Sequence, residues 1–487
     1  MRASPLYPLA GLTGRFGPQI APSNPRNVGH KEHKENIYYL DLVIYSVAIR
    51  QRGGKIMKHN HEFRDPIHTF ISLRTDERRV VDSRPFQRLR HIHQLALTYL
   101  VYPGATHKRF EHSLGVMHLA SRIFDVVTAP ENIFDDSVRR IIPDEEAKRY
   151  WKSVLRTAAL CHDLGHLPFS HAAEDQLLPD GYDHERLTKD IIRSPEMLEI
   201  WETMTPRLRS DDIIKLAVGP KKADPLELDT WESILAEIII GDAFGADRMD
   251  YLLRDSYHAG VEYGKFDHNR LINTLRILPL SYADTDEPAL GLESGGLESS
   301  EGLMVARYFM YKQVYLHPIR RVYDIHLVDF LKSWLPNRIF STKLKTILGM
   351  TDIEALAAIR KAYDTAKSSN YALAKRIECR EHFRFFYSAS PSDKDGGKLI
   401  PGRTIAAAAE ASFGRAAIRY DYVPPKSSAP NFPVRRYDGT IESSLKLSPI
   451  LEKLPAIEVD TVYCDKSILA DAVRWRQENA AKLLDLE

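Results

Sequence analysis

Residues Trp151 to Pro168 read WKSVLRTAALCHDLGHLP, and this stretch decides the fold. Its first fourteen residues are mostly apolar or helix-favouring, which predicts a helix from Trp151 to Leu164 that Pro168 helps to end. A histidine and an aspartate, His162 and Asp163, stand side by side near the end of that apolar helix. The sequence therefore predicts a helical core with two polar groups at a helix end.

The same helical pattern extends to both sides of this stretch. Apolar residues recur at helical spacing in three further segments, namely Phe86 to Ile92, Leu114 to Phe124 and Ile234 to Leu253. Before them, the turn signal Asp65-Pro66 precedes a short strand around Ile71. We therefore expect an all-α core from Arg84 to about Leu348, in which the Gly/Ser/Glu stretch Leu290 to Gly302 holds a short hairpin.

The pattern changes after this core. A helix is expected from Asp352 to about Lys367, then strands at Phe383 to Tyr387, Ala417 to Val423 and Ile457 to Tyr463, and a last helix at the end of the chain. Residues 1–56 have no sustained period, and we expect a mobile extension, or a start codon assigned upstream of a natural start at Met57. The fold class is mostly α, with an N-terminal extension (1–56), a helical core (57–350) and a smaller α+β lobe (351–487).

Composition limits the function and the compartment. The 487 residues carry 67 Lys plus Arg and 66 Asp plus Glu, a net charge of +1, so a strongly basic nucleic-acid-binding surface is not expected. Three widely spaced cysteines indicate a reducing compartment and no disulfide framework, and we expect a cytoplasmic protein. The apolar run Tyr38 to Ile49 has 12 residues, against roughly 20 for a membrane-spanning helix.

The pair His162-Asp163 is the first candidate for chemistry. An imidazole and a carboxylate can lean toward one point beyond a helix end and bind a divalent metal such as Mn, Fe, Zn or Mg. The spacing of His162 and His166 also imitates the two-histidine zinc helix of metalloproteases, although those carry Glu after the first His. A third interpretation is that the pair only caps the helix.

Two later segments place polar and aromatic residues at intervals of four, which is one face of a helix. They are Asp247, Tyr251 and Asp255, and then Arg307, Tyr311 and Tyr315. Such stripes suit a pocket for an anionic ligand that contains a ring, because guanidinium binds phosphate and phenol stacks. The alternative is a buried aromatic seam with its own ion pairs.

Two further segments contain clustered charges and histidines. Arg109 and His112 follow a basic turn that leads into a helix, and a helix N-terminus attracts anions. His184 stands between Asp183 and Glu185, which can raise its pKa and keep it protonated as a proton donor.

Taken in order, these motifs resemble a known family. His112 in RFEHS, the pair His162-Asp163 followed by GHLPFSH, and Asp247 in DRMDY match the H…HD…D signature of HD-domain phosphohydrolases. The resemblance is closest to the deoxynucleoside triphosphate (dNTP) triphosphohydrolases, both bacterial and vertebrate, and it runs from about Asp65 to His317. It implies metal-dependent hydrolysis of a dNTP at the α-phosphorus, releasing deoxynucleoside and inorganic triphosphate.

The resemblance also implies a role for each matching residue. The metal ligands would be His112, His162, Asp163 and Asp247. His184 would be the catalytic histidine beside Glu174 and Glu185, with Asp163, His166 and Arg109 also in the catalytic group. Substrate would contact Gln94, Leu95, Arg109, His171, Arg248, Tyr251, Asp255, Arg307 and Tyr315, of which Arg109 holds the α-phosphate, Arg248 and Arg307 the outer phosphates, and Gln94, Leu95, Asp255 and Tyr315 the sugar.

Two other functions fit the same motifs. The HD site could act on a nucleoside monophosphate, a cyclic nucleotide or a guanosine alarmone, or the domain could sense nucleotides without turnover. The number of cationic residues suited to a polyphosphate favours the dNTP interpretation, and the four filled ligand positions favour an enzyme.

The resemblance extends to regulation. Asp82, Gln87 and Arg90 match positions that read a guanine nucleotide between subunits in similar enzymes, which implies a homo-oligomer, a tetramer or dimer, activated by GTP or dGTP. Other activator positions differ, with Arg64, Phe70 and Pro318 where the vertebrate pattern has Asn, His and Lys. The structural alternative is that Asp82 caps the following helix and Arg90 pairs with a carboxylate.

Overall fold

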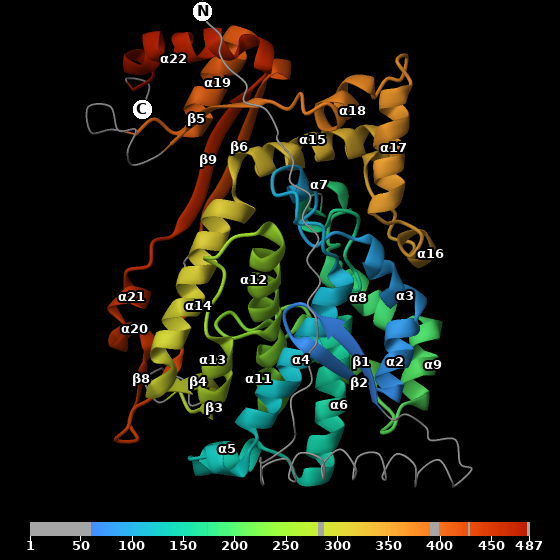
Figure 1. Cartoon of the computed structure of the whole chain (residues 1–487), viewed down its shortest axis with the longest axis vertical. Coiled ribbons are helices and arrows are strands. Elements are labelled where there is room, and N and C mark those ends of the chain that lie inside the picture. Colours follow the sequence, from blue (N-terminus) through green and yellow to red (C-terminus); the bar gives the residue numbers. More distant parts are fainter. Residues whose placement is uncertain (1–59, 173, 281–286, 390–398, 427–428, 485–487) are drawn as a thin grey trace, which may run out of the picture. The chain divides into compact units, whose positions relative to one another are not determined.

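The structure is a computed structural model that describes residues 60–484, apart from 173, 281–286, 390–398 and 427–428. The chain divides into two units, Met1–Lys58 and His59–Glu487. The expected extension (1–56) and the alternative start at Met57 lie outside the described residues. Figure 1 labels the helices and strands of the second unit.

The second unit begins with an antiparallel hairpin of β1 (Asn60–Asp65) and β2 (Thr69–Arg74). The Oδ1 atom of Asp65 accepts hydrogen bonds from the backbone N–H groups of Ile67 and His68, both at 2.9 Å, which closes the turn predicted at Asp65-Pro66. Ile71 is buried in β2, as the sequence predicted. Two short helices follow, α2 (Thr75–Asp82) and α3 (Arg84–Arg88).

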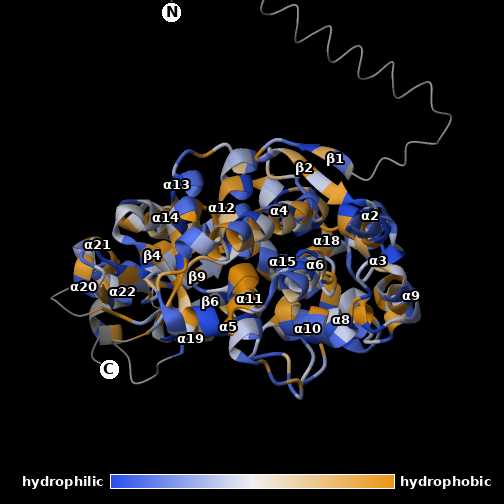
Figure 2. Ribbon diagram, turned by 90° about the horizontal axis from the view of Figure 1, so that it is seen from below, coloured by the Kyte–Doolittle hydropathy of each residue, from blue (hydrophilic) through white to orange (hydrophobic). Residues whose placement is uncertain are grey.

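A bundle of helices forms the core, which confirms the mostly α fold class. Its helices are α4 (Arg109–Val127), α5 (Asp136–Ile141), α6 (Glu145–Cys161), α7 (Glu174–Leu177), α8 (His184–Ile192), α9 (Pro195–Thr203), α10 (Ser210–Val218), α11 (Thr230–Ile240), α12 (Ala246–Ala259) and α13 (His268–Thr274). Helix α4 packs against both α6 and α12 near the middle of Figure 1. Figure 2 colours α11 as hydrophobic, in keeping with its buried apolar side chains.

Two predicted helix boundaries in this core are wrong. Helix α6 ends at Cys161, not at Leu164, and therefore well before Pro168. The expected segment Ile234 to Leu253 is two helices, α11 and α12, which are separated by a turn between Gly241 and Gly245. A Cβ atom at Gly245 would lie 2.7 Å from the backbone of Gly241, so this close turn requires glycine.

A mixed sheet with strand order β3-β4-β7-β8 joins distant parts of the chain. Its strands are β3 (Leu275–Leu278), β4 (Ala289–Glu293), β7 (Pro433–Arg435) and β8 (Ile441–Ser443). The hairpin expected within Leu290 to Gly302 is wrong, because that stretch holds only β4 before α14 (Leu297–Met310) begins. Through β7, Val434 joins the hydrophobic cluster of the helical core.

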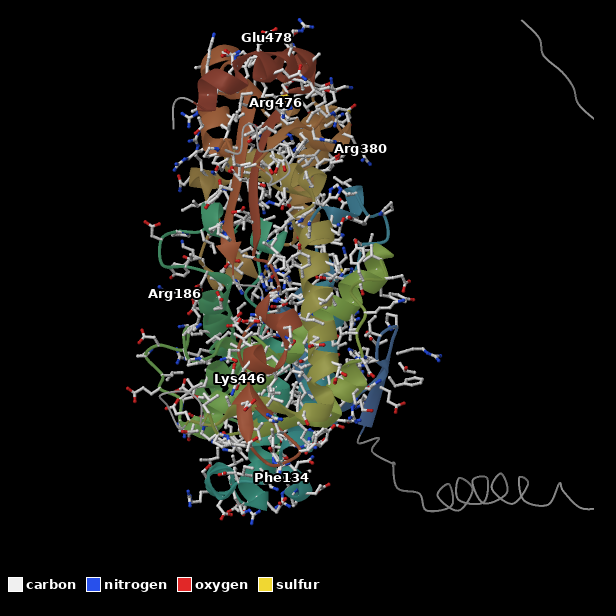
Figure 3. The ribbon with its side chains drawn as sticks, turned by 90° about the vertical axis from the view of Figure 1, so that its left-hand side faces the viewer. Phe134, Arg186, Arg380, Lys446, Arg476 and Glu478 are labelled. Atoms are coloured by element: carbon white, nitrogen blue, oxygen red, sulfur yellow. The ribbon has the colours of Figure 1, made fainter. Side chains whose placement is uncertain are left out.

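The remaining elements lead into a C-terminal α+β region. They are α15 (Pro318–Trp334), α16 (Leu344–Ile347), α17 (Asp352–Asp364), α18 (Tyr371–Glu378), β5 (Arg384–Ser388), α19 (Gly402–Phe413), β6 (Ile418–Lys426), α20 (Ser444–Leu447), α21 (Pro449–Glu452), β9 (Ile457–Cys464) and α22 (Leu469–Leu484). Strands β5, β6 and β9 lie close to the three predicted positions, and they pair as an antiparallel sheet in the order β5-β9-β6. Helices α19 and α22 pack together, and Figure 3 labels Arg476 on α22, whose guanidinium donates to the Phe386 carbonyl at 3.2 Å.

The apolar run Tyr38 to Ile49 lies outside the described residues. Among the described residues, no helix is long and apolar enough to cross a membrane. Cys161, Cys379 and Cys464 are all described and all free thiols.

Candidate active site

The end of α6 fixes the orientation of His162. Its Nδ1 atom lies 2.8 Å from the Ala159 carbonyl, one of the carbonyls that a helix end leaves without a backbone partner. A carbonyl can only accept, so Nδ1 carries the proton and Nε2 keeps the lone pair that binds a metal. His162 therefore does cap the helix, as one interpretation of the sequence predicted. The same hydrogen bond leaves Nε2 available as a ligand atom.

The metal candidates converge from three helices. His112 lies on α4, His162 at the end of α6 and Asp247 in the first turn of α12, and one donor atom of each lies within 4.8 Å of the other two. His112 Nε2 is 3.0 Å from Asp247 Oδ1, and His162 Nε2 is 3.6 Å from the same oxygen. His162 Nε2 is buried and has no hydrogen bond within the described part of the chain, as a metal-binding nitrogen requires.

Asp163 completes this group from the side. Its Oδ1 atom lies 3.3 Å from His162 Nε2, and its Oδ2 atom lies 3.7 Å from His112 Nε2. Arg109 pairs with Asp163 Oδ2, and the Arg109 Nε–H donates to the hydroxyl of Ser170 at 2.7 Å. A cationic group is therefore held directly beside the carboxylate that faces the metal candidates.

The carboxylates of this cluster favour positive charge between them, carried either by a proton on His112 Nε2 or by a metal ion that takes the place of that proton. Burial disfavours the charged form of His112, but hydrogen bonds to Asp247 and Asp250 raise its pKa to about 10. Burial also disfavours charge on Asp163, yet Arg109 and the two neighbouring histidines hold the pKa of this carboxyl well below its usual range. Burial likewise disfavours charge on Asp247, but hydrogen bonds with His112 and His162 hold the pKa of this carboxyl below its usual range. The carboxylates of Asp163 and Asp247 are thus ionised, and two imidazoles with two carboxylates suit Mn, Fe, Zn or Mg.

A second cluster lies beside the first. His166 stacks on His184 with ring centroids 4.1 Å apart, and His166 Nε2 is 3.2 Å from Asp163 Oδ1. His184 begins α8, where Glu174 Oε1 accepts from both its backbone N–H and its Nδ1, each at 2.7 Å. Glu185 lies 3.3 Å from the same ring nitrogen. The zinc-helix alternative is wrong, because α6 ends before His162 and His166 belongs to this second cluster.

The two stacked histidines differ in their pKa. Burial disfavours a charge on His184, but the hydrogen bond to Glu174 and the charges of Glu174 and Glu185 raise its pKa. Burial and the nearby Arg109 and His184 hold the pKa of His166 well below its usual range. Of the two rings, His184 therefore holds a second proton more readily, and His166 is the neutral neighbour.

Arg248 and Arg307, the candidates for binding the outer phosphates, both contact Asp242. Arg248 pairs with the Asp242 carboxylate and donates to the Gly241 carbonyl at 3.0 Å. Arg307 donates to the Asp242 carbonyl at 3.3 Å. The two guanidinium groups thus reach the same turn from α12 and α14, although they are 59 residues apart in sequence.

The aromatic stripes also meet. Tyr315 donates from its hydroxyl to Asp255 Oδ2 at 2.7 Å, and its ring contacts Tyr251 at 6.0 Å between centroids. Asp255 Oδ1 lies 2.7 Å from Nε2 of His107, a partner for which sequence reasoning gave no role. The stripe from Arg307 to Tyr315 is not one regular α-helical face, because α14 passes into the π-helical turn η6 (Tyr311–Tyr315).

Gln94 and Leu95, the remaining candidates for sugar binding, lie in a turn that a residue distant in sequence stabilises. Leu95 is buried, and Gln94 has a buried Oε1 without a hydrogen bond from any described residue. Asp352, at the start of α17, accepts from the backbone of His93 at 2.8 Å and from the backbone of Phe169 at 2.8 Å. The side chain of the last candidate, His171, lies outside the described residues.

The activator candidates Asp82, Gln87 and Arg90 lie on α2, on α3 and just after α3. Asp82 is exposed and pairs with Arg78 at 3.2 Å, whereas Ser83 caps α3. Arg90 donates to Gln87 Oε1 at 2.9 Å and covers the ring of Phe110. The structural alternative is therefore wrong in both parts, since Asp82 caps no helix and Arg90 has an amide and a ring as its neighbours.

Asp250 is the functional candidate that sequence reasoning left without a role. It is fully buried, and its Oδ2 atom lies 2.9 Å from His112 Nδ1. Its position in the DRMDY motif, three residues after Asp247, is a signal that could have placed it near the metal ligands.

Comparisons with known proteins show the family of the chain. The family model for the HD domain matches residues 109–227, and the model for the HD associated region matches residues 266–408. A crystal structure of a hypothetical protein from Aquifex aeolicus superposes with a TM-score of 0.69 at 32% identity, covering 85% of this chain and 99% of that one. The chain belongs to the HD-domain phosphohydrolase family.

Two curated proteins are similar to this chain over more than half of its length. An uncharacterized protein of Bacillus subtilis is 34% identical over 57% of this chain and 57% of its own length. The deoxynucleoside triphosphate triphosphohydrolase SAMHD1 of Mus musculus is 28% identical over 68% of this chain and 54% of its own length. The chain thus spans a little over half the length of these relatives.

Proposed function

We propose that this protein hydrolyses deoxynucleoside triphosphates to deoxynucleoside and inorganic triphosphate in a metal-dependent reaction. The observation that carries the proposal is the meeting of His112, His162 and Asp247 within 4.8 Å, beside a protonatable His184. The similarity to SAMHD1, a dNTP triphosphohydrolase by name, supports this choice of substrate.

The metal would be held by His112, His162, Asp163 and Asp247. The Nε2 of His162, which has no hydrogen bond among the described residues, and the carboxylates around it fit a divalent ion. Bound there, such an ion lowers the pKa of a water molecule and neutralises phosphoryl charge.

The side chains around the metal ligands would bind the α-phosphate and supply a proton. Arg109, fixed by Asp163 and Ser170, binds the α-phosphate and stabilises the charge that develops on it. His184, kept protonated by Glu174, donates its proton to the departing 5′-oxygen of the deoxynucleoside. His166 remains neutral and lines the phosphate channel.

The outer parts of the substrate would meet the groups further from the metal ligands. Arg248 and Arg307, close together at Asp242, bind the β- and γ-phosphates. Gln94, Leu95 and Tyr315 surround the sugar, where Tyr315 is fixed by Asp255. A 2′-hydroxyl would then face apolar Leu95 and an already occupied phenol, which disfavours ribonucleotides.

We further propose a homo-oligomer that GTP or dGTP activates through Asp82, Gln87 and Arg90. The exposed carboxylate of Asp82 can accept from guanine N–H groups, and Arg90 can donate to guanine acceptors. The test compares dATP hydrolysis with and without GTP in wild type and in Asp82→Ala, alongside light scattering. Activation that Asp82→Ala abolishes is expected, and a monomer without any response to GTP contradicts it.

The substrate assignment is tested by incubating the purified protein with each dNTP, singly and in pairs, with Mg²⁺ or Mn²⁺. Chromatography of the products should show deoxynucleoside and triphosphate. The same assay includes nucleoside monophosphates, cyclic nucleotides and a guanosine alarmone. Turnover of one of these alone, or of no nucleotide in any mixture, contradicts the proposal.

A further inference from the structure

A buried aspartate stands directly behind a proposed metal ligand. Asp250 lies on α12, is fully buried, and uses each of its oxygens twice. Its Oδ2 atom accepts from His112 Nδ1 at 2.9 Å and from Arg254 Nε at 2.8 Å. Its Oδ1 atom lies 2.7 Å from His68 Nε2 and 2.9 Å from a terminal nitrogen of Arg254. These contacts saturate the carboxylate.

The contact with His112 decides which ring nitrogen can exchange its partner Asp247 for a metal ion. A carboxylate accepts, so Nδ1 carries the proton and Nε2 is left facing Asp247. A ligating histidine commonly donates its second N–H to a carboxylate, which fixes the ring and raises its basicity. Asp250 stands in that position, although it lies on α12 and His112 on α4.

The same carboxylate connects the site to the first hairpin. Arg254 also pairs with Asp65 through a terminal nitrogen at 2.8 Å, and Asp65 closes the turn between β1 and β2 through the backbone of His68. His68 itself returns to Asp250. The turn, Arg254 and Asp250 thus form one continuous buried network that ends at His112.

A glycine on α4 leaves the space that this network occupies. Gly115 follows His112 by almost one turn of α4, and a Cβ atom there would lie 1.8 Å from Asp250 Oδ1 and 2.6 Å from Arg254. Only a residue without a side chain lets the ion pair of α12 lie this close to α4.

We propose that Asp250 is a positioning residue for the metal ligand His112, and that the β1–β2 turn sets metal affinity through Asp65, Arg254 and Asp250. The inference rests on the proposed metal site. It predicts that groups without any contact to the metal or the substrate change the metal dissociation constant.

The experiment is a titration of metal-stripped protein with Mn²⁺ alone, following free Mn²⁺ by electron paramagnetic resonance. Asp250→Asn should raise the dissociation constant by about 10–100-fold. Asp65→Asn should raise it by a smaller factor, because it acts through Arg254, and this variant keeps the test open if Asp250→Asn fails to fold. Circular dichroism reports the folding of each protein.

The matched control is Asp421→Asn. Asp421 is buried and holds Arg321 through two hydrogen bonds, at 2.9 and 2.6 Å, far along the sequence from the metal ligands. Its replacement should lower thermal stability without changing Mn²⁺ affinity.

Mn²⁺ affinity within twofold of wild type in folded Asp250→Asn and Asp65→Asn overturns the proposal, and so does an equal loss of affinity in Asp421→Asn. Hydrolysis of dATP is measured separately on the wild type. Weakened Mn²⁺ binding in the Asp250 variant, together with a wild type that hydrolyses no dNTP, would uphold the positioning role and contradict the proposed function.

Discussion

The two histidine clusters of the candidate site are built in different ways. His112 and His162 are buried on or at the ends of long helices, α4 and α6, and are fixed through Nδ1 by Asp250 and by a helix carbonyl. His184 is half-buried at the first residue of α8, and Glu174 on the four-residue helix α7 holds it. The proposed metal ligands are therefore held by long helices that pack together, whereas the proposed proton donor is held by carboxylates on and beside short helices.

The difference indicates how each cluster should respond to change. A metal ligand that is lost leaves the remaining carboxylates without a counterion, so binding and turnover fail together. A proton donor acts in the transition state, so its loss slows turnover while substrate still binds. Substitutions in the two clusters should therefore differ in whether metal binding or only turnover is lost.

Asp247→Ala and Asp163→Ala should each abolish turnover, because each removes a carboxylate that would face the metal. Elemental analysis of the purified variants should show bound metal well below the wild-type content. Wild-type metal content in both variants would show that the ligands are assigned wrongly.

His184→Ala should lower kcat by about 10²–10⁴ with little change in KM, since the metal and the arginines still hold the substrate. Steady-state kinetics with dATP measure both constants. Activity within about threefold of wild type would remove His184 from the mechanism.

Gly115→Ala should destabilise the protein by about 1–3 kcal/mol, because the added methyl group collides with Asp250 and Arg254. Chemical denaturation measures the free energy of unfolding. Gly302→Ala on α14 is the matched control, since its methyl group would meet only Phe266 Cβ, at 3.9 Å. Equal stability of the two variants would contradict the close approach of α4 and α12.

Glu174→Gln should change the pH dependence of kcat. The hydrogen bond and charge of Glu174 raise the pKa of His184, and a proton donor loses activity as the pH rises through its own pKa. Without Glu174 that pKa is lower, so the alkaline fall in kcat should move to lower pH. A pH–rate profile identical to wild type would mean that another group supplies the proton.

Leu95→Ala should weaken discrimination against ribose, by less than about tenfold, because it opens room beside the sugar without adding a hydrogen-bond partner for a 2′-hydroxyl. The ratio of kcat/KM for dATP and ATP measures it. Equal hydrolysis of ATP and dATP by the wild type would contradict the placement of the sugar.

The features of the fold that local periodicity determines could be predicted from the sequence. The helical core, the strands β5, β6 and β9 and the face shared by Asp247, Tyr251 and Asp255 on α12 follow from spacing alone. Contacts between distant segments could not be predicted in this way. Asp352 holds the turns at His93 and Phe169 from the start of α17, and Val434 returns to the helical core through β7.

Some local features of the helices depend on tertiary contacts that the sequence pattern does not show. The π-helical turn Tyr311–Tyr315 interrupts a stripe that the sequence shows as regular, and α6 ends at Cys161 because His162, not a proline, caps it. The pairing of Asp250 with His112 needs α4 and α12 in contact, which the glycine at position 115 permits.

The most direct test of the proposed reaction is hydrolysis of dATP in ¹⁸O-labelled water with Mn²⁺, followed by mass spectrometry of the products. Attack at the α-phosphorus breaks its bond to the 5′-oxygen, so the label should appear in intact inorganic triphosphate, in equal amount with unlabelled deoxyadenosine. Release of phosphate or pyrophosphate in place of triphosphate, or label in the deoxyadenosine, would contradict the account.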